Sequence, residues 1–366
     1  MSIEPHPDLS VRGSFLADVR ARIDARLEEV LQAAQVDAER AGPEPAAVVA
    51  ALAALVRRGG KRLRPALLTA AYLAGGGTLK QGAWPRAVTD AGVAFELLQA
   101  YFLVHDDWMD GDRERRGGPA VHAALEARHA SPHLGASLAV LAGDYASGLA
   151  HAVLAEMDAP PAVVVEATRL FCRMEQEVVL GQTLDLTLGD LRGPDAATGA
   201  DAAAVDRMHA LKTGSYTVHG PLAIGAALAL APLSVRAALG AFGAPLGVAF
   251  QLRDDLLGTF GDPSDTGKPV GSDLRTGKRT ALVASAFARA SAQDRARLAQ
   301  VLGQGDALDP RDLAFAVELL ERCGARADLE ARIAALHDEA VAALAPLGAD
   351  AALLVELAGA IARRSK

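Results

Sequence analysis

Cysteine, aromatic residues and basic charge are all scarce in this sequence. Its 366 residues include only two cysteines, Cys172 and Cys323, and their wide separation excludes a disulfide framework or a cysteine-based zinc site. Aromatic residues make up 4% of the chain and β-branched runs are few, which favours closely packed helices over sheets. The net charge of −8 argues against nucleic-acid binding, because such proteins carry a basic excess or stripe. We expect an all-α protein that binds no nucleic acid.

The sequence also shows few signs of a linker between domains, a secretory signal or a membrane-spanning segment. No linker rich in proline, glycine and serine is long enough to separate two cores, so we expect a peripheral helical segment over 1–44 and one large helical domain over 45–366. The N-terminal residues lack the basic start and apolar core of a secretory signal. The uncharged stretch between Lys212 and Arg236 holds prolines and polar side chains, which favour buried helices over a membrane span. We expect a cytoplasmic protein without a membrane span.

Helical periodicity covers most of the chain, in which alanine and leucine dominate. Glycines and prolines mark the junctions between helices. The sequence predicts helices over about 15–35, from just after Pro45 to Gly59, and near 66–74, 86–108, 119–128, 135–156, 160–187, 201–214, 219–230, 233–257, 278–288, 292–302, 310–322 and 326–364.

The segment 95–110 is an apolar helix that ends in a cluster of acids. Asp106 and Asp110 are four residues apart and share one helical face, with Asp107 beside them. Like charges at this spacing repel each other at the unfavourable end of the helix dipole, so a cation must offset them. Carboxylates completed by phosphate oxygens are the ligands that Mg²⁺ prefers. Taken alone, the cluster is equally consistent with a solvated helix end.

A second acidic cluster closes another long apolar helix, over 250–258, where Asp254 and Asp255 are adjacent. Two such pairs are hard to explain as unrelated helix ends exposed to solvent. Together they indicate two groups of carboxylates that face each other and bind metal ions. Groups of basic residues flank both clusters. The guanidinium group of arginine can bind two oxygens of a diphosphate at once, and lysine adds a positive charge beside them. These cations are Lys61, Arg64, Arg115, Arg116, Lys212, Lys268 and Lys278.

These motifs resemble the trans-isoprenyl diphosphate synthase, or polyprenyl synthetase, family over roughly 45–290. Residues 106–110 with Arg115 and Arg116 are similar to its first aspartate-rich motif, and 60–65 to its isopentenyl-diphosphate-binding motif. Residues 143–144, 181–186, 212–213, 250–251 and 267–268 match as well. The resemblance implies an isoprenoid synthase-like bundle of helices around a central cavity, usually in a homodimer.

The resemblance also implies roles for the site residues. The metal ligands would be Asp106, Asp107, Asp110 and Asp254, with Asp255 in support, and they would hold three Mg²⁺ ions and an allylic diphosphate. That diphosphate would be gripped by Arg115, Lys212 and Lys268, and Lys212 would be catalytic together with the ligands. Isopentenyl diphosphate would bind to Lys61, Arg64, Gln99 and Arg116, while Thr213, Gln251 and Lys278 would line the substrate site.

A magnesium-chelated diphosphate is a good leaving group, because the charge that develops on it is stabilised in advance. We therefore expect head-to-tail condensation of isopentenyl diphosphate with an allylic diphosphate. No histidine–acid pair is needed as a base, and we expect His105 to be a packed helix histidine. Many relatives carry Asp-Asp-x-x-Asp in the second motif, but here Gly258 replaces the last acid. Asp262 or water would then complete the metal shell.

Product length depends on where the cavity ends. Phe102 lies one turn before Asp106 on the same face, about 6 Å along the axis, and Tyr101 lies beside it. Bulky residues at both positions resemble farnesyl diphosphate synthases, so we expect a C15 product, with geranylgeranyl diphosphate (C20) as the alternative and C10 as a lesser one. A terpene cyclase would not need the second basic site, and only Gly258 favours a non-catalytic partner subunit.

Overall fold

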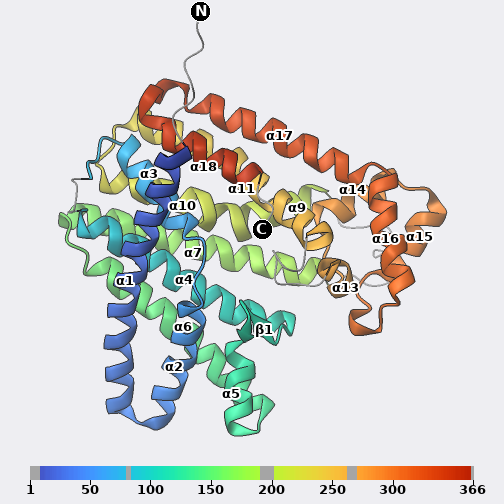
Figure 1. The fold of residues 1–366 in the computed structure, drawn as a ribbon, viewed down its shortest axis with the longest axis horizontal. Coiled ribbons are helices and arrows are strands. Elements are labelled where there is room, and N and C mark those ends of the chain that lie inside the picture. The colour runs from blue at the N-terminus through green and yellow to red at the C-terminus, as the bar shows by residue number, and fades with distance from the viewer. Residues whose placement is uncertain (1–8, 80–83, 190–201, 262–269, 364–366) are drawn as a thin grey trace, which may run out of the picture. The chain divides into compact units, whose positions relative to one another are not determined.

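The structure, a computed structural model, describes residues 9–79, 84–189, 202–261 and 270–363. Within these ranges the chain is helical apart from one short hairpin, which confirms the all-α prediction (Figure 1). The chain divides into two compact units. Unit 1 comprises Met1–Leu170 with Pro221–Pro232, and unit 2 comprises Phe171–Gly220 with Leu233–Lys366. The predicted division at residue 45 stays a prediction.

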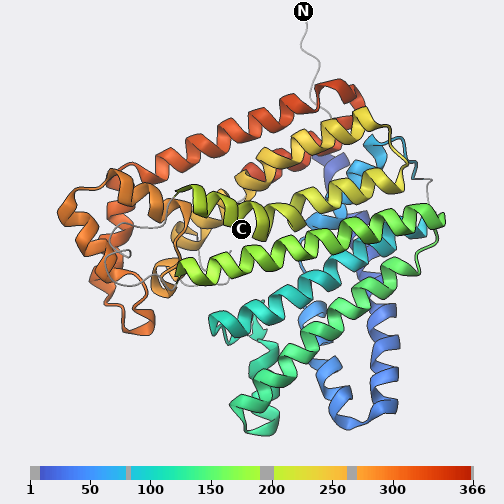
Figure 2. The same cartoon turned by 180° about the vertical axis from the view of Figure 1, so that it is seen from behind.

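Unit 1 is organised around the helix α4. Its elements are α1 (Leu9–Ala41), α2 (Pro43–Arg57), α3 (Leu63–Ala74), α4 (Arg86–Asp110), the strands β1 (Glu114–Arg115) and β2 (Gly118–Pro119), α5 (Val121–His129), α6 (Pro132–Ala155), the first part of α7 (Pro161–Gly189) and most of α10 (Gly220–Leu228). Contacts to α4 come from α1, α2, α3, α5 and α6, and Figure 2 shows α6 running alongside it. Ile23, Leu27 and Leu31 bury the apolar stripe of α1, so this first helix contributes to the core.

Unit 2 is organised around α11. Its elements are the rest of α7, α9 (Ala202–His209), the π-helix η1 (Ala210–His219), α11 (Leu233–Phe260), α13 (Ser272–Thr276), α14 (Ala281–Arg289), α15 (Ala292–Val301), the 3₁₀ turn η2 (Gly305–Ala307), α16 (Pro310–Arg322), α17 (Ala325–Ala343), the 3₁₀ segment η3 (Ala345–Ala351) and α18 (Ala352–Ala362). Contacts to α11 come from η1, α13, α14, α17 and α18. Leu252, Leu256, Leu274 and Leu282 belong to one buried cluster that joins these helices.

Three predicted helices differ clearly from the structure. The helix predicted over 201–214 is α-helical only to His209, and the π-helix η1 then continues to His219. The single helix predicted over 326–364 is wrong, because α17 ends at Ala343 and α18 begins at Ala352. Between them Gly348 has φ 54° and ψ −131°, a non-helical conformation that favours glycine and interrupts the helix. The helix predicted from residue 278 begins instead at Ala281, because the Thr280 side chain accepts a hydrogen bond from the Val283 N–H and acts as the N-cap.

By length and composition, α4, α6, α11 and the stretch Ala345–Ala362 are each apolar enough to cross a membrane. In α4, 72% of the most apolar window is buried inside the protein. The same helix carries Asp90 and Glu96, which are buried and form ion pairs with Arg26 and Arg62. Acids neutralised by arginines from neighbouring elements are typical of a helix packed inside a protein core. We therefore interpret α4 as a core helix of unit 1.

Candidate active site

The first acidic cluster lies at the C-terminal end of α4. Gly111, at φ 73°, ends this helix in the left-handed conformation that glycine adopts without a Cβ clash. Asp106 and Asp110 are half-buried on one helical face. Asp107, in contrast, has a side chain that is 0% exposed. The three predicted ligands thus differ sharply in their access to solvent.

Asp107 is held by Arg115, which the sequence predicts to bind the allylic diphosphate. The Arg115 Nε donates to Asp107 Oδ1 over 2.6 Å, and its Nη2 lies 3.1 Å from Asp112 Oδ2. Burial is the largest influence on the Asp107 carboxyl and raises its pKa to about 6, although Arg115 acts in the opposite direction. The buried Oδ2 of Asp107 accepts no hydrogen bond from the residues that the structure describes. A buried carboxylate oxygen in this state is a suitable ligand for a cation.

A tight hairpin carries both arginines of the Arg115-Arg116 pair. Arg115 pairs with Gly118, so Arg116 and Gly117 are the two loop residues. Both have positive φ, 53° and 72°, as a type I′ hairpin turn requires. Arg58 anchors the hairpin, because its Nη1 donates to the carbonyl oxygens of Arg115 and Pro119 at 2.8 and 2.9 Å.

The hairpin brings Arg116 to the basic turn at 59–64. The Arg116 guanidinium donates to the carbonyl of Gly59. Arg64, at the end of this turn, donates to Gln99 Oε1 of α4 over 2.6 Å. Lys61 is exposed in the same turn. The four residues predicted to bind isopentenyl diphosphate therefore come from three nearby segments of unit 1.

The guanidinium groups in this region repel one another. The pKa of Arg116 is lowered, mainly by burial, and the charges of Arg62, Arg64 and Arg115 lower it further. Glu96 acts in the opposite direction without cancelling these effects. An anion with several oxygens would relieve this repulsion, and a diphosphate has the required chemistry.

Arg62 is a structural residue of the site that the sequence-based prediction omits. Its side chain is 4% exposed and bridges two acids, Glu96 of α4 and Asp24 of α1, the latter at 2.7 Å. Its backbone adopts φ 53°, which is uncommon for a residue other than glycine. The paired guanidinium holds the basic turn in this conformation. Its partner Glu96 lies 34 positions away in the chain, so local sequence carries no signal of the pairing.

Tyr101 and Phe102 lie on α4 before the acidic cluster and are both half-buried. Their ring centroids are 4.9 Å apart, and the Tyr101 ring also meets His105 edge-on at 4.7 Å. The Nε2 of His105 lies 3.1 Å from the Val140 carbonyl oxygen of α6. These contacts agree with the interpretation of His105 as a packed helix histidine, and they place a layer of aromatic rings one turn before Asp106.

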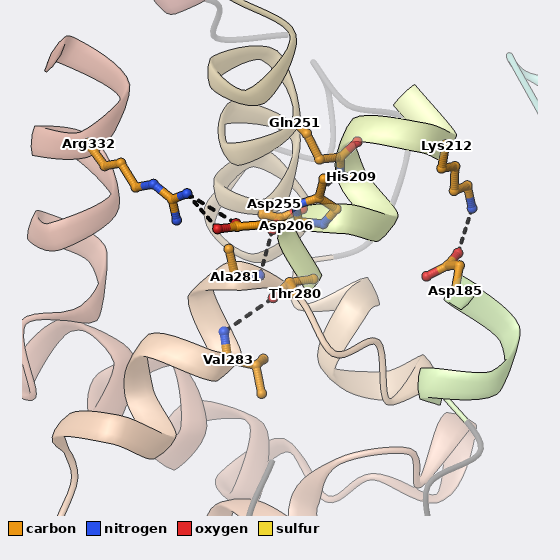
Figure 3. Close-up of polar contacts among 10 residues, drawn as sticks. All are labelled: Asp185, Asp206, His209, Lys212, Gln251, Asp255, Thr280, Ala281, Val283 and Arg332. Atoms are coloured by element: carbon orange, nitrogen blue, oxygen red, sulfur yellow. Dashed lines mark hydrogen bonds and ion pairs between the residues drawn. The ribbon is translucent and has the colours of Figure 1, made fainter. Parts of the chain in front are cut away.

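The second acidic cluster lies at the end of α11 in unit 2 (Figure 3). Asp254 is half-buried, whereas the side chain of Asp255 is 2% exposed. Asp255 Oδ1 accepts a hydrogen bond from Gln251 Nε2 at 2.9 Å, and Oδ2 accepts one from the Ala281 N–H at 2.8 Å. The second bond satisfies an amide at the start of α14. Asp255, predicted to support the metal, thus joins α11 to α14, and Gln251, predicted to line the substrate site, holds the Asp255 carboxylate from within α11.

His209 of α9 is buried beside Asp255, with its Nε2 3.8 Å from Asp255 Oδ2. Burial lowers the pKa of His209 to about 4. Burial also raises the pKa of the Asp255 carboxyl to about 7. Both shifts disfavour the charged form, because the surrounding protein cannot replace its hydration. This histidine is a second residue that the sequence-based prediction omits.

Lys212 and Thr213 lie on η1, and Lys212 Nζ is 2.5 Å from Asp185 Oδ2 of α7 (Figure 3). A π-helix is rare and often marks a functional site. Gly181 of α7 allows η1 to approach, since a Cβ there would lie 2.6 Å from the Lys212 Cα. Asp185 belongs to the 181–186 motif, but its pairing with Lys212 is visible only in the fold.

Of the remaining predicted residues, the structure describes only one. Lys278 is half-buried and follows α13, whereas Lys268 and Asp262 lie outside the described residues. Across the described ranges, no group of three or more His, Cys, Asp or Glu side chains is arranged to hold a metal ion by itself. Mg²⁺ commonly takes one or two carboxylates and completes its shell with water and substrate phosphates. Each cluster, taken by itself, has the one or two carboxylates that such a metal takes from a protein.

Comparisons with known proteins agree with these features. A family model described as polyprenyl synthetase matches residues 45–320. The chain is 40% identical to the (2E,6E)-farnesyl diphosphate synthase of Mycobacterium tuberculosis H37Rv over 278 residues, which cover 75% of this chain and 70% of that protein. It is 32% identical to the geranylgeranyl diphosphate synthase of Methanosarcina mazei over 305 residues, covering 83% and 82%.

The fold is similar to that of solved enzymes. A geranylgeranyl pyrophosphate synthase from Corynebacterium glutamicum, complexed with isoprenyl diphosphate and magnesium, matches with a TM-score of 0.88 and 34% identity over 95% of this chain and 99% of that chain. A geranylgeranyl pyrophosphate synthetase from Pyrococcus horikoshii matches with a TM-score of 0.79 and 28% identity over 96% and 99%.

Proposed function

Because the chain belongs to the polyprenyl synthetase family and is therefore a prenyltransferase, we propose that it condenses isopentenyl diphosphate head to tail with an allylic diphosphate to form farnesyl diphosphate. The observation that carries this proposal is the group of arginines in unit 1. Arg64 contacts Gln99, while the pKa of Arg116 is lowered by burial and by the neighbouring arginines. Such a group is suited to a ligand with several negative oxygens.

Isopentenyl diphosphate is the substrate that this basic group suits. Its diphosphate would be held by Lys61, Arg64, Gln99 and Arg116. A terpene cyclase, which uses one diphosphate substrate, would leave these cations without a purpose. The double bond of the bound molecule is the nucleophile, so the residues need only orient it and keep water away from the reacting carbons.

The enzyme requires a divalent metal, and we propose that this metal is Mg²⁺, with three ions in each active site. The ligands would be Asp106, Asp107, Asp110 and Asp254. The buried, unbonded Oδ2 of Asp107 supports this assignment, as does the magnesium in the Corynebacterium glutamicum structure. When bound, Mg²⁺ neutralises the charge that develops on the leaving diphosphate. Arg115, Lys212 and Lys268 would grip the same diphosphate, with Thr213 and Lys278 beside it.

Asp255 and Gln251 are assigned a supporting role. Both oxygens of Asp255 accept hydrogen bonds within the protein, and one of the donors is Gln251. We propose that this arrangement orients the end of α11, so that Asp254 is held at a fixed position.

The product is proposed to be C15. The aromatic layer of Tyr101 and Phe102 lies one turn before Asp106, where a growing chain would meet it. The 40% identity to a farnesyl diphosphate synthase also favours this length. Geranylgeranyl diphosphate is the second candidate, because the Corynebacterium glutamicum enzyme that matches the fold is named for that product.

We further propose that the enzyme works as a homodimer in the cytoplasm. Large apolar side chains that are exposed within each unit, on α6 and on α7, support the first part, since exposed apolar patches often mark an interface. These residues include Leu141, Val165, Val179 and Leu180. Sedimentation of the purified protein would measure the oligomeric state.

The test is elongation with defined primers. Purified protein is incubated with Mg²⁺, labelled isopentenyl diphosphate and, separately, C5, C10 and C15 allylic diphosphates, and the dephosphorylated products are resolved by chain length. We expect elongation to stop at C15. A C20 product would support the proposed reaction but would show that the aromatic layer of Tyr101 and Phe102 does not end the cavity. No elongation from any primer would favour a cyclase or a partner subunit.

Variants test the metal assignment in the same assay. Asp106→Ala and Asp254→Ala should each abolish turnover, because each removes a charged ligand. Normal turnover in either variant would contradict its assignment. The surface variant Asp328→Asn serves as a control, since Asp328 pairs with exposed Arg289.

A further inference from the structure

The second acidic cluster lacks a carboxylate at a position where the first cluster has one. In the first cluster, Asp106 and Asp110 are four residues apart and share one face of α4. In the second, Asp254 is followed four residues later by Gly258, which has no side chain. The end of α11 therefore presents only one half-buried carboxylate from its own sequence, because Asp255 is used for internal hydrogen bonds.

A carboxylate from a different helix fills the space at Gly258. A Cβ placed on Gly258 would lie 2.6 Å from the Asp273 Cγ and 3.0 Å from its Oδ1, with Oδ2 closer still. The distances to Cγ and Oδ2 are shorter than non-bonded heavy atoms tolerate, so a side chain at residue 258 and the present Asp273 side chain cannot coexist. The Asp273 carboxylate thus occupies the place where a side chain of residue 258 would begin.

The position of Asp273 is built into unit 2. Asp273 lies on α13, which contacts α11 (Figure 1). The next residue, Leu274, is 0% exposed in the core cluster of the unit and anchors this short helix. Ser272 donates a hydrogen bond to the Gly258 carbonyl at 3.3 Å, and the Lys278 N–H donates to the Asp273 carbonyl at 2.9 Å. The contact is therefore fixed on both sides of Asp273.

We propose that Asp273 supplies the carboxylate that Gly258 lacks and acts with Asp254 as a ligand of Mg²⁺ at the second cluster. The inference rests on the proposed function, which brings magnesium and diphosphate to this site. Gly258 follows Asp254 by four residues, so a carboxylate held against Gly258 lies toward the same face of α11 as Asp254, as Asp110 does relative to Asp106 on α4. A pair of carboxylates with phosphate oxygens is the ligand set that Mg²⁺ prefers. Gly258 is then required, since any side chain there would displace Asp273.

Binding of inorganic pyrophosphate in the presence of Mg²⁺, measured by calorimetry, tests the proposal without turnover. Asp273→Asn keeps the shape of the side chain but removes its charge. We expect it to weaken magnesium-dependent binding by at least about tenfold, because a loss of tenfold to a hundredfold is typical even for residues that only orient a metal's ligands. Asp312→Asn is the matched control, because Asp312 is an acid of the same unit that pairs with Arg297 on the surface. Its binding should equal that of the wild type.

Relocation of the acid gives a sharper test. Asp273→Ala should bind as weakly as Asp273→Asn. Adding Gly258→Asp to Asp273→Ala moves the carboxylate onto α11, into the space that the first substitution empties. The double variant should regain most of the binding, whereas Gly258→Ala alone, which pushes Asp273 aside, should lose it. Thermal unfolding without metal reports whether each variant is folded.

The outcomes separate this proposal from the proposed function. If the wild type elongates primers and Asp273→Asn binds magnesium pyrophosphate as tightly as the wild type does, the assignment of Asp273 is wrong and the function stands. The assignment is also wrong if the double variant binds no better than Asp273→Ala. A wild type that elongates no primer would overturn the proposed function, and the metal role of Asp273 with it.

Discussion

Replacement of Glu96 by leucine should destabilise the protein strongly, because it leaves Arg62 buried without its main partner. Both side chains are only 4% exposed. Removing one partner of a buried ion pair costs about 3–5 kcal/mol, since the remaining charge keeps its desolvation penalty. Asp24 still contacts Arg62 at 2.7 Å, but its own side chain is 40% exposed and solvent weakens that pair. We therefore expect a loss in the free energy of unfolding near the lower limit, about 3 kcal/mol.

Urea unfolding followed by circular dichroism measures this loss. Glu29→Gln is the matched control, because Glu29 forms an ion pair with Arg26 at 2.9 Å but is 61% exposed. Exposed pairs of this kind contribute less than about 1 kcal/mol. The double variant Arg62→Met with Glu96→Leu removes both charges together, so its stability should exceed that of Glu96→Leu alone.

A kinetic effect should accompany the loss of stability. Arg62 lies between Lys61 and Arg64, and its pairing with Glu96 holds their turn in place. Glu96→Leu should therefore raise KM for isopentenyl diphosphate more than KM for the allylic substrate. If Glu96→Leu costs no more stability than Glu29→Gln, the Arg62–Glu96 pair does not have the role inferred here.

Three further predictions concern the product, the π-helix and pH. Phe102→Ala should lengthen the product beyond C15 in the elongation assay, and an unchanged product would mean that the cavity ends elsewhere. Gly181→Ala should push Lys212 away at a cost of about 1–3 kcal/mol and raise KM for the allylic diphosphate, whereas Gly148→Ala, which meets no atom within 4 Å, should change neither. His209 has a pKa lowered to about 4 by burial, so its contribution to stability is present above pH 6.5 and is lost between pH 6.5 and 4, by on the order of 3 kcal/mol. His209→Gln should remove this part of the pH dependence of urea unfolding, and an unchanged slope would contradict the assignment.

Sequence by itself determined the features that depend on near neighbours in the chain. The helices follow from apolar periodicity, and the acids at the ends of α4 and α11 are recognisable because residues four apart share a helical face. The Arg116-Gly117 hairpin was not predicted, although glycine in a two-residue turn is a local signal for one. Family membership was also predictable, because its motifs are short and contiguous.

Only the tertiary structure decided which of these residues act on each other. Arg62 pairs with Glu96, 34 positions away, and Lys212 pairs with Asp185, 27 positions away. Asp273 lies against Gly258 only because α13 packs on α11. No helical period links such residues, since their separation is set by intervening loops and by the packing of buried side chains. Sequence therefore identified the charged groups, and the fold selected their partners.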